Sequence, residues 1–131
     1  MKHWKRTEKY LRMIRELLLE QGVECIMTMH PYGIHVGPEH WQSGRVSWGF
    51  EEGKTYDDYF AYDIVQEFAE RNGIICINTL DAFLAAKDKQ LFFDYDGHLT
   101  PHGNKVFADY VTENKAFQNI IRTLGERNKN D

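Results

Sequence analysis

The stretch RNGIICIN at residues 71–78 decides the fold. The residues before it, over 56–72, place apolar side chains at helical spacing and predict an amphipathic helix. Gly73 ends this helix, because glycine readily adopts the left-handed conformation in which many helices stop. The apolar run over 74–78 that follows predicts a buried strand.

The same order of elements occurs once more, nearer the N-terminus. An amphipathic helix is predicted over 5–21, Gly22 follows it, and residues 23–29 form a second apolar strand. Two helix–glycine–strand units in series indicate parallel strands with helices packed outside them, since parallel strands need crossover connections. The sequence therefore predicts an α/β fold with a small parallel sheet, then a short helix over 79–87 and a last helix from Thr100-Pro101.

The composition describes one globular domain of 131 residues, with 42% hydrophobic and 14% aromatic residues. The formal net charge is -4, so the chain lacks the clustered basic face that nucleic-acid binding requires. No apolar run is long enough for a membrane span, and no signal segment is visible, so we expect a cytoplasmic protein unless a signal lies upstream. Cys25 and Cys76 lie in apolar runs and are expected to be small buried hydrophobic residues.

The domain is expected to span residues 1–117, with residues 118–131 as a partly frayed C-terminal extension. Within the domain, residues 30–54 form a long loop rich in His, Pro, Gly and Trp that follows the first strand. A loop of this length is usually functional or disordered. Ligands of open α/β sheets bind outside the carboxyl ends of the strands, so this loop is a candidate border of a site.

Histidine and aromatic side chains are frequent in this loop. His30, His35 and His40 recur every five residues, a spacing that gives them no shared helix or strand face. A chance cluster is therefore the favoured interpretation of these histidines. Three aromatic residues could stack on a sugar or an acyl group, or pack back on the core: Tyr32, Trp41 and Trp48.

The stretch DYDGHLTPHGN at residues 94–104 carries the chemistry. Asp96 lies two residues before His98, and Gly97 between them allows a tight turn. Thr100-Pro101 supplies a helix N-cap and a first helical proline, which anchor the loop behind His98. A carboxylate in this position can accept a hydrogen bond from one ring nitrogen of His98 and leave the other free to take a proton from a hydroxyl.

The longer stretch DGHLTPHGNKVFADYV at residues 96–111 resembles the final motif block of the SGNH/GDSL hydrolases, a family of esterases and acyltransferases. The upstream order of helix, strand, long loop, helix and strand is similar too, so the resemblance covers roughly residues 8–116. It implies that His98 is the general base, that Asp96 orients it, and that the fold is part of a flavodoxin-like three-layer sandwich. It also places His30 on the substrate side of the sheet.

Two features depart from the family's commonest pattern. The acid usually stands three residues before the histidine, where this chain has Tyr95, while two-residue spacing occurs in relatives that add or remove esters on polysaccharides. Asp94 therefore stays an alternative to Asp96 as the orienting acid. The Gly-Asp-Ser and Gly-x-Asn-Asp blocks of the family, which supply the nucleophile and the oxyanion donors, are missing. The two serines, Ser43 and Ser47, both lie in the long loop.

The sequence thus predicts the C-terminal half of an SGNH-type ester hydrolase or O-acyltransferase, a fragment or remnant that needs no cofactor and is inactive alone. Its expected partners are an acylated carbohydrate or lipid ester, and further copies of itself, because a partial sheet leaves an edge or a face uncovered. Two alternatives stay open. One is a non-catalytic binding or assembly module. The other is a metal-binding protein whose ligands come from one cluster: Asp94, Asp96, His98 and His102.

Overall fold

The computed structural model describes residues 2–127 and has the predicted α/β fold. Its sheet consists of two parallel strands, β1 (Ile26–Met29) and β2 (Ile75–Asn78), with Ile26 opposite Ile75 and Met29 opposite Asn78. Both strands follow a glycine with positive φ, Gly22 at +68° and Gly73 at +62°. Each of these glycines lies just after a helix, so the predicted order of helix, glycine and strand is present in both units.

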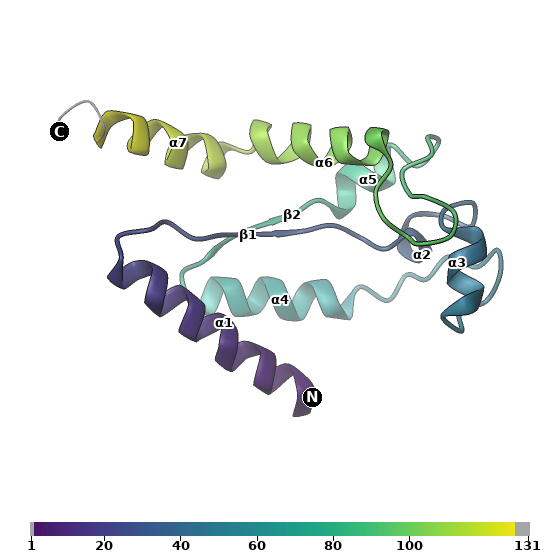
Figure 1. The fold of residues 1–131 in the computed structure, drawn as a ribbon, viewed down its shortest axis with the longest axis horizontal. Coiled ribbons are helices and arrows are strands. Elements are labelled where there is room, and N and C mark those ends of the chain that lie inside the picture. Colours follow the sequence, from purple (N-terminus) through teal and green to yellow (C-terminus); the bar gives the residue numbers. More distant parts are fainter. Residues whose placement is uncertain (1, 128–131) are drawn as a thin grey trace.

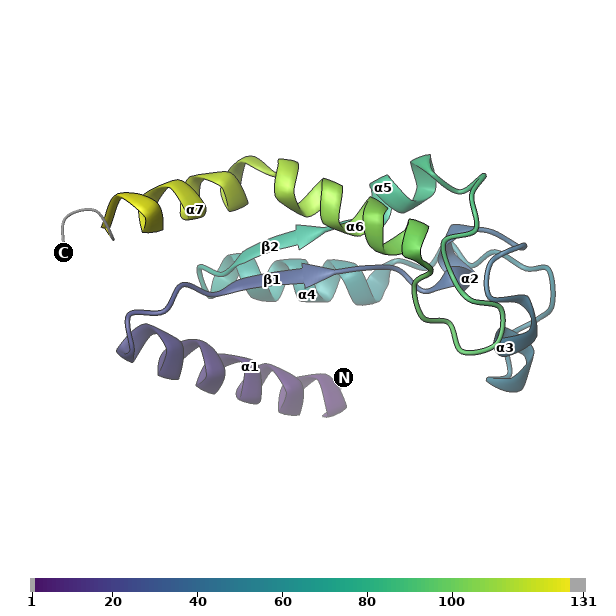
Figure 2. The same ribbon diagram turned by 45° about the horizontal axis from the view of Figure 1, so that its top comes forward.

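Helices cover both faces of this sheet (Figures 1 and 2). α1 (Lys2–Glu20) and α4 (Phe60–Arg71) lie on one side, whereas α6 (Pro101–Glu113) and α7 (Lys115–Arg127) lie on the other. Two parallel strands with flanking helices confirm the predicted α/β architecture. The carboxyl ends of the strands lead into the end of the molecule that holds the long loop and the start of α6 (Figure 2).

The first hydrophobic cluster, here called the layer core, lies between the helices and one face of the sheet. It consists of the buried residues Phe68, Ala69 and Ile74, against which Trp4 of α1 packs. The Trp4 and Phe68 rings meet edge to face with centroids 5.9 Å apart. Cys25 and Cys76 border this cluster as free, half-buried thiols. Burial raises the pKa of the Cys76 thiol, which disfavours the nucleophilic thiolate.

The second cluster, here called the loop core, lies at the carboxyl end of the sheet. Residues 30–54 are ordered there and contain two short helices, α2 (Gly33–Val36) and α3 (Gln42–Ser47). Their side chains pack with α5 (Leu80–Ala85) and with residues 91–92. The buried members of the loop core are Ile34, Val36, Trp41, Phe83, Leu91 and Phe92.

One helix start differs from the sequence prediction. The helix predicted over 56–72 begins at Phe60, because residues 54–58 are not helical and Asp58 Oδ1 accepts a hydrogen bond from the Phe60 N–H at 3.1 Å. The backbone of Tyr56 instead donates to the Ile34 carbonyl at 2.8 Å and so belongs to the loop core. A tertiary hydrogen bond therefore overrides the local helical pattern at this boundary.

The predicted C-terminal extension is helical as far as the structure describes it, because α7 continues through Gly125 to Arg127. Its partial fraying stays a prediction. Phe117, Ile120 and Leu124 are half-buried and share one helical face, which gives the helix an apolar stripe to pack. Residues 128–131, also assigned to the tail, lie outside the described residues. The domain boundary at residue 117 stays a prediction.

Within residues 2–127, no helix combines the length and the apolar character that a bilayer crossing requires.

Candidate active site

The turn that carries Asp96 and His98 is pinned at both ends. Phe92 and Leu99 form an antiparallel bridge, and the Phe93 N–H donates to the His98 carbonyl at 2.8 Å. Gly97 makes the turn with φ of +71°, a conformation that favours glycine. The loop is thus held as a tight hairpin rather than as a free connection.

Thr100 anchors the chain directly behind this turn. Its Oγ1 accepts a hydrogen bond from the Gly103 N–H at 3.1 Å, and Pro101 occupies the first helical position of α6. The same hydroxyl donates to the Gln90 carbonyl at 2.7 Å, which ties the start of α6 to the preceding segment. The predicted N-cap therefore fixes the position of His98 two residues upstream.

Asp96 and His98 face each other at this turn. Asp96 Oδ1 accepts the His98 backbone N–H at 2.9 Å, and Oδ2 lies 3.2 Å from His98 Nδ1. The hydrogen bond from the His98 backbone is the main reason that the pKa of Asp96 lies below its usual value, so this carboxyl stays ionised near neutral pH. With its proton on Nδ1, the ring would present Nε2 as a base. The side chain of His98 is 82% exposed, and that of Asp96 is 59% exposed.

Asp94, the alternative orienting acid, makes different contacts. Its Oδ2 accepts a hydrogen bond from the Ser43 hydroxyl at 2.5 Å, and its Oδ1 accepts the Ser43 N–H at 3.2 Å. These bonds hold the pKa of Asp94 below its usual value. The Asp94 carbonyl also accepts the Gly44 N–H at 2.9 Å. Asp94 therefore fastens the turn to the start of α3, while Asp96 is the acid that contacts His98.

The Trp41 side chain packs against the turn that carries Asp96 and His98. Its indole Nε1 donates to the Tyr95 carbonyl at 3.3 Å, and its own backbone adopts the left-handed conformation with φ of 53°. A Cβ at Gly44 would lie 1.9 Å from Trp41 Nε1, and one at Gly97 would lie 2.9 Å from Trp41 Cε2. Only glycine allows the two chain segments to approach the indole this closely.

Arg45 is a structural residue that the sequence analysis did not identify. Its side chain is fully buried, and its guanidinium donates to the carbonyls of Lys54 at 2.6 Å, Gly37 at 2.7 Å and His40. These bonds satisfy loop carbonyls that have no partner in a helix or sheet. Burial lowers the pKa of the guanidinium. In the sequence, the one indication of a buried arginine that bonds loop carbonyls is its position among glycines and tryptophans in the long loop.

A cleft of about 720 Å³ brings the turn and the long loop together. It is lined by ten residues: His30, Tyr32, Trp41, Trp48, Phe50, Asp96, Gly97, His98, Leu99 and Asn104. His30 thus borders the candidate site, while the other two loop histidines do not. His40 is buried with Nε2 2.9 Å from the Lys87 carbonyl, and His35 Nδ1 lies 3.0 Å from the Tyr56 carbonyl.

The serines of the long loop do not border this cleft. Ser43 donates to Asp94, and the Ser47 hydroxyl lies 3.4 Å from the Ser43 carbonyl that it donates to. Neither serine is among the cleft-lining residues, so neither faces His98 across the cleft. Within residues 2–127, no three His, Cys, Asp or Glu side chains gather in an arrangement that could hold a metal ion. The proposed Asp/His metal cluster is therefore not assembled in the described part of the chain.

Comparison with known proteins identifies the family of the chain. A protein-family model described as "SGNH hydrolase-like domain, acetyltransferase AlgX" matches residues 2–130. No curated protein and no solved structure is similar enough to the chain to count as a match. The family model covers nearly the whole sequence and agrees with the α/β layers of the fold. The chain therefore belongs to the family of SGNH hydrolase-like domains of the acetyltransferase AlgX type.

Proposed function

We propose that the chain supplies the acid–base pair of an acyl-transfer site that acts at a hydroxyl or ester of an acylated carbohydrate. The observation that carries the proposal is the contact between Asp96 Oδ2 and His98 Nδ1, 3.2 Å apart at the mouth of an aromatic cleft. The match to a family described by its acetyltransferase gives the acetyl ester as the first substrate to test.

The chemistry assigned to the pair is proton transfer. His98 Nε2 takes the proton of an attacking hydroxyl as the hydroxyl oxygen bonds to the acyl carbon. The imidazolium that forms is stabilised by the Asp96 carboxylate, and it returns the proton to the departing oxygen when the old ester bond breaks. One bond forms, one breaks, and His98 ends neutral.

The proposal includes a nucleophile or acceptor hydroxyl, because no serine of the described residues 2–127 lines the cleft with His98. Ser43 is engaged with Asp94, and Ser47 lies outside the cleft lining. We propose that another polypeptide segment or a partner chain supplies this hydroxyl and the oxyanion donors. The 131-residue chain is then expected to be inactive alone, because covalent catalysis needs an activated nucleophile.

The tautomer of His98 tests the acid–base role directly. Long-range proton–nitrogen NMR spectra of the 131-residue chain above pH 8 are expected to show the proton on Nδ1, because Asp96 Oδ2 accepts a hydrogen bond there. Asp96→Asn is expected to raise the share of the Nε2–H tautomer, whereas Asp94→Asn leaves the tautomer unchanged. A dominant Nε2–H form that does not respond to Asp96→Asn would rule out the role assigned to the pair.

An ester assay tests the second part of the proposal. The purified chain is expected to cleave p-nitrophenyl acetate no faster than its His98→Ala variant, because no serine faces His98. Strong multiple-turnover hydrolysis that His98→Ala abolishes would show that a nucleophile is present after all. His102→Ala is the control, since His102 is exposed in the first turn of α6 and does not line the cleft.

A non-catalytic binding module is the second candidate, and one observation favours it. The cleft displays exposed aromatic rings, while the chain offers no serine to the histidine beside them. Binding of a saccharide together with a His98 tautomer that ignores Asp96 would favour this reading over the acid–base role.

We also propose that copies of the chain associate with each other. The sheet has only two strands, so each strand has one unpaired edge. α1 in addition exposes Met13, Ile14 and Leu17. Light scattering is expected to show a concentration-dependent dimer or larger species, and Leu17→Glu to shift it towards the monomer. A strictly monomeric protein at high concentration would contradict this proposal.

A further inference from the structure

The strand β1 keeps one edge open. The Met29 carbonyl accepts the N–H of Thr79, which directly follows β2, at 3.0 Å, so the backbone groups of Met29 point to β2. Successive residues of a strand direct these groups to opposite sides, so those of Thr28 point to the other edge. Thr28 is exposed, and the described residues give its backbone no partner there. Such an unpaired edge is a template for a further strand.

The positions of the helices show where a further parallel strand fits. α1 and α4 lie on the same side of the sheet (Figures 1 and 2), and α4 connects β1 to β2. Connections between parallel strands are right-handed in nearly all proteins, so units whose helices share one face add strands in one direction. A parallel strand that leads into a helix in the place of α1 therefore lies beside β1, on the side away from β2.

The helix α1 carries an apolar stripe that the layer core does not cover. Its Trp4 packs on Phe68, and on the neighbouring flank Glu8 Oε1 lies 3.2 Å from Arg71 Nη2 of α4. α4 packs against β2, while α1 lies on the β1 side of the sheet (Figure 2). Helical spacing places the stripe on the flank away from Glu8, and its four residues are each at least half exposed: Tyr10, Met13, Ile14 and Leu17.

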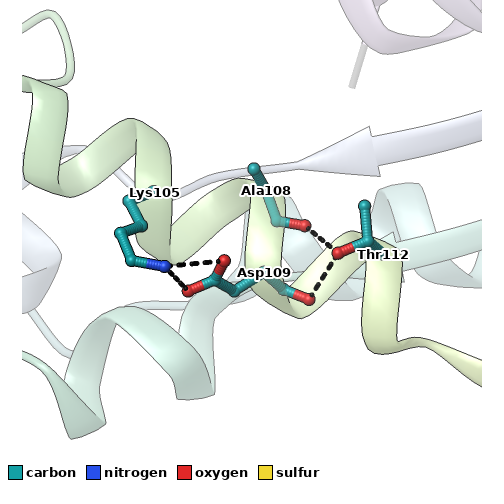
Figure 3. Close-up of polar contacts among 4 residues, drawn as sticks. All are labelled: Lys105, Ala108, Asp109 and Thr112. Atoms are coloured by element: carbon teal, nitrogen blue, oxygen red, sulfur yellow. Dashed lines mark hydrogen bonds and ion pairs between the residues drawn. The ribbon is translucent and has the colours of Figure 1, made fainter.

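The outward surface of α6, on the other side of the sheet, is polar by comparison (Figure 3). Lys105 Nζ lies 2.8 Å from Asp109 Oδ2, and both side chains are more than half exposed. The Thr112 hydroxyl donates to the Ala108 carbonyl at 2.8 Å. These side chains bond within their own helix, so this surface does not need a partner chain. The apolar stripe on the side of the open edge belongs to α1.

A strand that pairs in parallel with β1 would end at the cleft. His30 directly follows β1 and lines the cleft together with Asp96 and His98. Parallel strands have their carboxyl ends at the same edge of a sheet, which is where ligands of open α/β sheets bind. The residues that follow a parallel strand would therefore reach the border of the cleft, whereas an antiparallel strand would direct them to the opposite end of the sheet.

We infer that the open edge of β1 and the apolar stripe of α1 form a docking surface for an apolar β-strand of a partner polypeptide, which pairs in parallel with β1 and packs under α1. The inference rests on the proposed function only for the role of the residues that this strand brings to the cleft. A second copy of the chain fits less well, because a two-fold axis would pair the β1 edges antiparallel and place the two clefts at opposite ends. Self-association uses this surface only while the partner strand is absent.

A tethered strand tests the inference on the full chain. A second copy of the β2 sequence, residues 74–78, is fused ahead of Lys2 through a Gly/Ser linker of about six residues. α1 begins level with the carboxyl ends of the strands (Figure 1), so this short linker suits the parallel orientation. The control fusion carries proline at the second and fourth positions of the added strand, because proline cannot donate to a ladder.

Amide exchange, nuclear Overhauser contacts and light scattering measure the docking. Exchange of the Thr28 amide and of the added strand is expected to be about tenfold slower than in the control fusion. Overhauser contacts are expected to join the added strand to β1 in a parallel register. Light scattering is expected to show a monomer for the fused strand and self-association for the control, because the docked strand covers the open edge and the stripe.

Substitutions in the fused chain assign the effect to the surface. Thr28→Pro removes the N–H at the open edge and keeps the groups of Met29 that face β2, so it is expected to release the added strand, whereas Thr28→Val keeps it docked. Leu17→Glu places a charge against the added strand and is expected to speed its amide exchange. Phe60→Glu is the matched control, because Phe60 is as exposed as Leu17 but lies on α4. Unchanged far-UV circular dichroism would show that the fold is intact.

Four outcomes would overturn the inference. In the first, the added strand exchanges as fast as the proline control, and in the second it pairs with β2 or runs antiparallel to β1. In the third, Thr28→Pro and Leu17→Glu both leave it docked, and in the fourth, β1 pairs with β1 of a second copy despite the tether. These measurements do not involve His98. A docked strand with a failed tautomer test contradicts only the acid–base role, and a passed tautomer test without docking contradicts only this inference.

Discussion

The layer core and the loop core satisfy their backbone in opposite ways. In the layers, helices and paired strands bond their own carbonyls, and most strand residues are only half-buried, with Ile77 the single fully buried one. In the loop core, irregular backbone is buried, and side chains such as Arg45 must bond its carbonyls. The comparison teaches that the regular part of this molecule depends on its own backbone hydrogen bonds, whereas the irregular part beside the cleft depends on buried side chains that bond the backbone.

Arg45→Met tests this contrast with the largest expected effect. The variant takes the guanidinium donors away from the buried carbonyls of Gly37 and His40, so we expect the free energy of unfolding to fall by about 4 kcal/mol. Urea unfolding followed by far-UV circular dichroism measures it. Arg71→Met is the control in the layers, where the arginine is exposed, and it should cost less than about 1 kcal/mol. Equal losses in the two variants would remove the contrast.

Gly44→Ala probes the packing of the loop core with the next largest effect. The added Cβ would meet Trp41 Nε1 at 1.9 Å and the Tyr95 carbonyl at 2.2 Å, so the turn must shift at a cost of about 3 kcal/mol. Gly125→Ala in α7 is the matched control, because nothing lies within 4 Å of its added Cβ. Because Gly125 lies in the last turn of α7, that change is expected to stabilise by at most about 0.5 kcal/mol. A tolerated Gly44→Ala would mean that the cleft floor is not close-packed.

The same contrast explains how far the sequence could be interpreted. Periodic apolar residues and Gly73 predicted α1, α4, the two parallel strands and the α/β class, because these depend on local spacing. The Asp-x-His turn and the Thr100 cap were also predictable, since the contacts of the cap and of Asp96 join residues at most three apart. Their catalytic role stays a prediction.

The loop core could not be predicted in this way. Its contacts join distant positions, such as Ser43 with Asp94, 51 residues apart, and Trp41 with Tyr95, 54 residues apart. Neither helical nor strand periodicity encodes such pairs, so the contact of Asp94 with Ser43 was not predictable, and Asp96 as the orienting acid stays a prediction. The contacts of Arg45 are closer in sequence, but they lie within irregular backbone that has no periodic pattern. The helix α7 was not among the predicted elements for another reason, since the apolar stripe after residue 117 was given less weight than its position near the chain end.

Acid is expected to loosen the loop core before the layers. Burial is the main reason that the pKa of His40 is lowered from its ordinary value of about 6.5. The unfolded chain therefore takes up a proton first as the pH falls below about 6.5, and stability is lost from there down to the folded pKa, by at most about 1.4 kcal/mol per pH unit. Above about pH 6.5, His40 is neutral in both the folded and the unfolded chain, and its burial no longer makes stability depend on pH.

Urea unfolding curves recorded between pH 8 and pH 5 measure how the free energy of unfolding depends on pH, for the original chain and for His40→Phe. The difference in slope between the two proteins isolates the contribution of His40 from that of the other histidines. Between pH 8 and pH 5, amide protection factors, which correct for the slower intrinsic exchange in acid, are expected to fall more in residues 30–54 than in α4. A slope that is identical in both proteins would show that His40 titrates alike in the folded and unfolded chain.

The smallest effect is expected where an arginine binds an acid on the surface of the layers. Arg71 Nη2 lies 3.2 Å from Glu8 Oε1 and links α4 to α1. A double-mutant cycle of Glu8→Gln and Arg71→Met is expected to give a coupling of about 0.5 kcal/mol that shrinks with added salt, because water screens an exposed pair. A coupling above about 2 kcal/mol would mean that α1 is held by more than the packing of Trp4 on Phe68. The guanidinium of Arg45 has the same chemistry as that of Arg71, yet its loss is expected to lower the free energy of unfolding several times more. The surroundings of the guanidinium therefore decide how much it stabilises the fold.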